Sequence, residues 1–150
     1  MLSFTHTLTS LPLAYLMSSP LLIFAAAFVW HLLCDSLLHW NVYAEDYKRY
    51  PWFLVMSDVA GGLLFAWLAT GDDILTLPVL AAIAGGNAPD VAHTVWDALP
   101  RAIRSKFSAW ATPWFQFHNN LQLEAKSWHH GWQWQAFLIT VAIALVTILR

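Results

Sequence analysis

Four long apolar segments constrain the fold of this 150-residue chain more than any other feature of the sequence. They cover residues 20–39, 52–70, 74–86 and 132–149. The first, second and fourth approach the ~20 residues that a helix needs to cross a bilayer. Only 11% of the residues are charged, against about 25% in an average soluble domain. We therefore expect one integral membrane domain that occupies residues 1–150.

A weaker apolar segment, residues 4–17, leaves the number of membrane crossings open. Hydropathy alone does not make it a span, and it ends at a turn signal, Ser-Ser-Pro at residues 18–20. The chain crosses the membrane five times if this segment spans it and four times if it does not. The predicted fold is an all-α polytopic bundle of four to five transmembrane helices.

The distribution of charge predicts how the bundle is oriented. Six of the seven lysine and arginine residues lie in the connections at 41–51 and 87–130, whereas the connection at 71–73 is acidic. The positive-inside rule places both basic connections in the cytoplasm, and residues 71–73 and the C-terminus outside. Residues 91–103 and 105–126 are expected to form amphipathic helices at the cytoplasmic face. The net charge of −2 gives no indication of nucleic-acid binding.

His31 and Asp35 place two ionisable side chains four residues apart inside the first apolar segment. This spacing puts both side chains on one helical face. An ionisable residue within a bilayer is costly and usually marks a functional site. At ~1.5 Å of rise per residue, His6, Asp58 and Asp90 fall at a similar depth in the inner half of the bilayer. The pair can belong to a site shared by several helices, or form a structural ion pair.

Imidazole nitrogens and carboxylate oxygens are suitable ligands for one or two divalent ions, with zinc or manganese as the expected metal. The candidate ligands are His6, His31, Asp35, Asp58, Asp90 and His118. Asp58 is also the candidate general base. Three of these residues have specific alternatives. Asp90 after a proline can be a helix N-cap, and His6 can be an interfacial histidine. Asp58 can hydrogen-bond a neighbouring helix that packs closely against Gly61 and Gly62. His39 fits a ligand role and a structural role equally, and Gln135 is expected to hydrogen-bond residues around the site.

At these residues the sequence resembles a family of small bacterial integral membrane proteins and, more distantly, the LexA-regulated membrane-bound metal-dependent hydrolases. The matching stretches are THTLTS at 5–10, HLLCDSLLHW at 31–40, Asp58, GGNAPD at 85–90, FHNNLQ at 117–122 and GWQWQ at 131–135. The departures are Leu38 in place of a proline and Asn119 and Gln122 in place of two histidines. The resemblance implies a membrane-embedded polar site and hydrolase activity.

The predicted function is that of a metal-dependent hydrolase acting at the inner leaflet on a phosphorylated lipid. The basic connections would attract anionic headgroups, and the expected partner is membrane lipid. One alternative is a non-catalytic protein, in which the cluster is structural or binds a metal or haem, as a homo-oligomer or a subunit of a larger assembly. Another is a small transporter or proton path that uses the same carboxylates.

Overall fold

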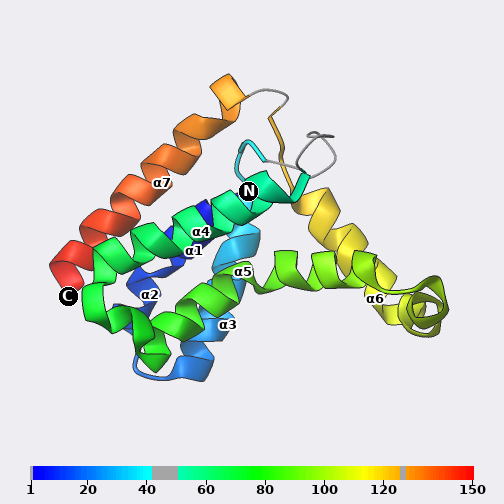
Figure 1. Ribbon diagram of the computed structural model, residues 1–150, viewed down its shortest axis with the longest axis horizontal. Coiled ribbons are helices and arrows are strands. Elements are labelled where there is room, and N and C mark those ends of the chain that lie inside the picture. The colour runs from blue at the N-terminus through cyan, green and yellow to red at the C-terminus, as the bar shows by residue number, and fades with distance from the viewer. Residues whose placement is uncertain (1, 42–50, 126–127) are drawn as a thin grey trace.

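The computed structural model describes residues 2–41, 51–125 and 128–150. Its elements are α1 (Ser3–Ser10), α2 (Pro12–Leu16), α3 (Pro20–Asp35), α4 (Pro51–Thr70), the 3₁₀ turn η2 (Gly71–Leu75), α5 (Leu77–Ala98), α6 (Arg101–Leu121) and α7 (Trp128–Leu149) (Figure 1). Within these residues the only β-type pairing is an isolated bridge between His39 and Glu124. The all-α expectation is therefore confirmed.

The segment that hydropathy ranked weakest contains the central helix of the bundle. α1 contacts α3, α4, α5 and α7, and every residue from Thr5 to Ser10 is buried. Its threonines and serines lower the apolar signal, but their small side chains let neighbouring helices approach closely. A Cβ added at Gly62 of α4 would lie 3.0 Å from the Phe4 Cα. α1 is thus surrounded by protein on several sides and does not need a lipid-facing apolar surface.

In the described part of the chain, two helical segments are long and apolar enough to cross a membrane, Phe53–Leu75 and His129–Leu149. This is fewer than the four to five predicted spans. α3 is a shorter apolar helix because it ends at Asp35, whereas the sequence suggested an apolar segment up to residue 39. α5 is long, but its second half carries Asp90, His93 and Asp97.

The course of α5 corrects the prediction that Asp90 caps a new helix. α5 continues through Pro89 and ends only before Leu99, so Asp90 lies within the helix. A proline inside a helix removes one backbone hydrogen bond and distorts the preceding turn. In that turn, the Gly86 carbonyl lies 2.7 Å from His31 Nδ1. Pro89 thus lies within one turn of the point at which α5 faces the histidine of α3.

The second half of α5 and α6 form an arm that extends away from the bundle (Figure 1). Two helices were expected over residues 91–103 and 105–126, but residues 91–98 belong to α5 and α6 covers Arg101–Leu121. α6 contains three basic residues and no acidic one. Phe107 and Trp110 on α6 are 45% and 68% exposed. The C-terminal turn of α6 returns to the bundle and carries the buried His118.

Candidate metal centre

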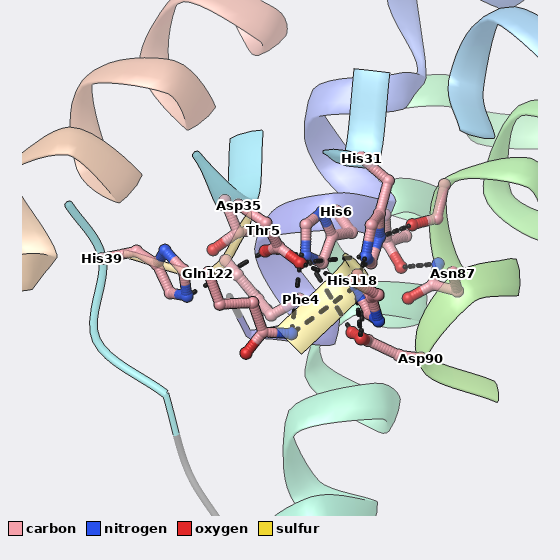
Figure 2. Close-up of polar contacts among 12 residues, drawn as sticks. Phe4, Thr5, His6, His31, Asp35, His39, Asn87, Asp90, His118 and Gln122 are labelled. Carbon is pink, nitrogen blue, oxygen red and sulfur yellow. Dashed lines mark hydrogen bonds and ion pairs between the residues drawn. The ribbon is translucent and has the colours of Figure 1, made fainter. Parts of the chain in front are cut away.

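His31 and Asp35 face one another on the last turn of α3. The His31 Nε2 lies 3.1 Å from Asp35 Oδ2, and both side chains are 0% exposed. The helical spacing therefore produces the contact that the sequence predicted. Figure 2 shows that this pair is surrounded by side chains from other helices.

His118 of α6 and Asp90 of α5 complete a group of four potential ligands. The His118 Nε2 lies 3.1 Å from Asp35 Oδ2 and 3.2 Å from His31 Nε2. Asp90 Oδ1 lies 3.6 Å from His31 Nε2 and 3.9 Å from His118 Nε2. One ligand atom from each of the four residues lies within 4.8 Å of all the others, so this group can hold a metal ion.

The spacing of these atoms is compatible with a small divalent ion. Ligands at 2.0–2.1 Å from a tetrahedral zinc are about 3.3 Å apart. The separations that involve His31 or His118 run from 3.1 to 3.9 Å. The Asp90 side chain is 28% exposed, whereas the other three are fully buried. The group is therefore enclosed on the side of α3 and α6 and open beside Asp90.

The hydrogen bonds of His31 fix which ring nitrogen faces the group. A carbonyl oxygen can only accept, so His31 Nδ1 at 2.7 Å from the Gly86 oxygen must carry the hydrogen. The neutral ring then presents the lone pair of Nε2 to Asp35. A lone pair and a carboxylate repel one another unless a proton or a cation lies between them. Metal-binding histidines typically donate their other N–H to such a carbonyl.

His6 of α1 joins the group from its other side. Its Nε2 lies 3.2 Å from Asp35 Oδ1 and 4.0 Å from Asp90 Oδ2. Its ring is stacked on the ring of His31, with centroids 3.7 Å apart and an interplanar angle of 22°. His6 therefore lies in one polar cluster with His31 and Asp35, as the sequence predicted.

His39 also approaches Asp35, although not along a continuous helical face. α3 ends at Asp35, and the chain then turns so that the His39 backbone pairs with the segment after α6. The His39 N–H donates to the Leu123 oxygen at 3.1 Å, and the Ala125 N–H donates to the His39 oxygen at 2.7 Å. The His39 side chain is fully buried, with Nε2 3.9 Å from Asp35 Oδ1.

The structure places Asp58 outside this group. The Asp58 Oδ1 accepts a hydrogen bond from the Phe4 backbone N–H at 3.3 Å. Its carboxylate therefore lies at the N-terminus of α1, where it satisfies a free helix N–H and complements the helix dipole. The sequence prediction used only the depth of Asp58 along α4. Depth does not show whether the side chain points to the start of α1 or to His31.

Gln122 and Gln135 contact different parts of the site. The Gln122 Nε2 lies 3.5 Å from both Asp35 Oδ2 and His118 Nε2. Gln135 binds the backbone next to His39: its Nε2 donates to the Trp40 oxygen at 3.0 Å, and its Oε1 accepts from the Trp40 N–H at 3.4 Å. The expected role of Gln135 beside the site agrees with these contacts. The contribution of the Gly86 carbonyl was not predictable, because a backbone oxygen has no sequence signal.

Comparison with family models, curated proteins and solved structures finds no match to this chain. The resemblance to the membrane-bound metal-dependent hydrolases therefore remains a prediction. Four of its motifs nevertheless supply side chains to one place, through His6, His31 with Asp35, Asp90, and His118. Residues separated by more than 100 positions in the sequence thus form one buried cluster.

Proposed function

We propose that this chain is a polytopic protein of a bacterial inner membrane, with four to five crossings. The apolar segments Phe53–Leu75 and His129–Leu149 support this proposal. Large apolar side chains on the outside of the bundle also support it, such as Leu21 on α3 and Ile148 on α7 at 77% and 78% exposure. Extensive apolar surface of this kind favours contact with lipid.

The ends of these two segments are compatible with the proposed orientation. Arg150, which follows α7, donates from Nε to Asp73 Oδ2 at 3.1 Å. The acidic connection after α4 and the end of α7 therefore lie together. This agrees with an arrangement in which both are outside, and the basic connections that precede α4 and α7 are in the cytoplasm.

Within this membrane domain we propose a metal-dependent hydrolase. The observation that carries the proposal is the convergence of His31, Asp35, Asp90 and His118 from α3, α5 and α6, with Asp90 partly exposed. Catalytic metal sites keep an open position, whereas structural sites are closed by protein ligands. A divalent cation held there supplies Lewis acidity, which activates water and stabilises charge on a phosphoryl oxygen.

The residues of the chain would then divide the remaining tasks. Asp35 is fully buried between His31 and His118 and would orient both rings. Asp90 lies at the open side, with longer distances to both histidines, and would hold the cation beside the place where an attacking water enters. We do not assign the general base to Asp58, because its carboxylate binds the start of α1.

The proposed substrate is a phosphorylated lipid of the inner leaflet. α6 carries Arg101, Arg104 and Lys106 and has no acidic residue of its own, although Arg104 lies 3.7 Å from Asp97 of α5. The Phe107 and Trp110 side chains of α6 are exposed. A helix with basic and aromatic side chains of this kind binds the surface of anionic membranes. Because the same helix ends at His118, a headgroup attracted by α6 would lie near the metal group.

A second candidate is a non-catalytic membrane protein that holds the metal for structural reasons, as a homo-oligomer or as a subunit of a larger assembly. The complete burial of His31, Asp35 and His118 favours it. Haem held between His6 and His31 is not supported. The ring of His6 is stacked on that of His31 at 3.7 Å, so a porphyrin does not fit between them.

Metal analysis combined with a hydrolysis assay tests the proposal. Wild-type protein, Asp35→Asn and the control Asp97→Asn would be purified in detergent and their metal content measured. Phosphate release would be followed with phosphatidate in mixed micelles. Asp97 is a suitable control because it lies outside the group, is 63% exposed and binds His93 and Arg104. We expect metal and phosphate release to be lost in Asp35→Asn only.

The other outcomes distinguish the two candidates. Stoichiometric metal without phosphate release would favour the non-catalytic protein. Wild-type protein that binds no divalent metal, and an Asp35→Asn variant with unchanged stability, would refute both candidates.

A further inference from the structure

The two oxygens of Asp35 face different pairs of histidines. Oδ2 lies 3.1 Å from the Nε2 atoms of both His31 and His118. Oδ1 lies 3.2 Å from His6 Nε2 and 3.9 Å from His39 Nε2. The four-residue group described above uses only the first pair, so the second pair requires its own explanation (Figure 2).

The Nε2 atoms of His6 and His39 are fully buried and, among the described residues, have no hydrogen-bond partner of suitable geometry. The hydrogen of His39 is on the opposite nitrogen, because Nδ1 lies 2.8 Å from the Leu37 carbonyl oxygen. The neutral His39 ring therefore presents a lone pair to Asp35, as His31 does. Two buried nitrogens directed at one carboxylate oxygen are costly unless they share a bound partner.

Asp90 repeats the pattern of Asp35. Its Oδ1 is the oxygen near His31 and His118, whereas its Oδ2 lies 4.0 Å from His6 Nε2. Each carboxylate thus offers one oxygen to the first pair of histidines and the other oxygen to the second side. Carboxylates that bridge in this way are typical ligands of two neighbouring cations.

We propose that the chain binds a second divalent cation, held by His6, His39 and the Oδ1 of Asp35, with Asp90 bridging to the first. This inference rests on the metal centre of the proposed function and extends it. Two divalent cations and two carboxylates leave two positive charges. The substrate class that matches this excess is a phosphate monoester dianion, which two ions can clamp through its oxygens.

The number of bound ions is the direct test. Purified full-length protein in detergent would be loaded with Mn²⁺, the bound manganese counted, and its electron paramagnetic resonance spectrum recorded. We expect two ions per chain and a spin-coupled spectrum in the wild type. His39→Ala should bind one ion with an uncoupled spectrum. His93→Ala should remain like the wild type, because the His93 ring lies near His118, at 6.0 Å between centroids, without belonging to either pair.

The outcomes separate this proposal from the proposed function. One ion per wild-type chain, uncoupled and unchanged in His39→Ala, would overturn the second cation and leave the first site in place. No bound ion in the wild type would overturn both. The wild-type spectrum needs no substitution, so it remains a test even where His39→Ala does not fold.

Discussion

Replacing Gly85 by alanine tests how closely α3 and α5 must pack to assemble the metal group. A Cβ at Gly85 would lie 2.9 Å from both the Phe24 Cα and the Ala27 Cβ, and would also overlap the Phe24 carbonyl oxygen. Carbon atoms at optimal contact are about 3.5–4.0 Å apart, so the two helices must separate by roughly 1 Å. The obstructing atoms belong mainly to the backbone of α3 and cannot rotate away.

The expected loss of stability follows from two opposing effects. Overpacking a well-packed interior costs about 1–3 kcal/mol, and the backbone contact places Gly85→Ala at the upper end. The higher helix propensity of alanine offsets up to about 1 kcal/mol. We therefore expect a net loss of about 2 kcal/mol.

The same displacement would weaken metal binding, since α3 carries His31 and Asp35 whereas α5 carries Asp90. Metal–ligand distances are maintained within about 0.2 Å, which is much less than the predicted separation of the helices. We expect the metal affinity to fall by about 10–100-fold, as it does when residues that support metal ligands are lost.

Gly61→Ala is the matched control. A Cβ there would meet only the Phe4 ring, at 3.4 and 3.7 Å, which is ordinary contact with a side chain that can adjust. Thermal unfolding in detergent and competition with a chelator would measure both variants. The reasoning is refuted if Gly85→Ala and Gly61→Ala unfold at the same temperature and retain metal equally.

Three further changes give expected outcomes. Asp58→Ala should lower stability by about 1 kcal/mol through loss of a helix N-terminal hydrogen bond, with unchanged metal content; loss of metal would instead support a ligand role. Gln135→Ala should cost about 1–3 kcal/mol by leaving backbone groups beside the site unpaired, measured by thermal unfolding, and a neutral result would contradict this. The triple variant Arg101→Gln, Arg104→Gln, Lys106→Gln should hydrolyse phosphatidate at a rate that no longer depends on salt concentration. A rate that depends on salt as strongly as in the wild type would exclude α6 as the headgroup-binding surface.

The sequence predicted the parts of the site that depend on local periodicity. The contact between His31 and Asp35 follows from four-residue spacing on a helix. Depth estimates also placed His6 and Asp90 at the right level. The same estimate included Asp58, which lies on a face of α4 directed at the start of α1. Depth is determined by counting residues, but orientation around a helix axis depends on how the helices pack.

Other features depended on tertiary contacts that no local pattern encodes. A proline normally indicates a helix end, yet α5 continues through Pro89. His39 reaches Asp35 after a chain reversal, stabilised by backbone pairing with Leu123 and Ala125. α1 has a weak hydropathy signal because it is covered by protein rather than lipid.

Asn119 and Gln122, two of the three departures from the predicted family pattern, can be explained by their positions in the structure. Asn119 is exposed on α6 and is not part of the group. Gln122 lies one turn after His118, and its amide nitrogen is 3.5 Å from Asp35 Oδ2. An amide N–H at that position donates toward the carboxylate and stabilises its charge, whereas a histidine there would compete for the same oxygen. The absence of imidazoles at these two positions therefore leaves the four candidate ligands in place, and the capacity to hold a cation depends on His31, Asp35, Asp90 and His118.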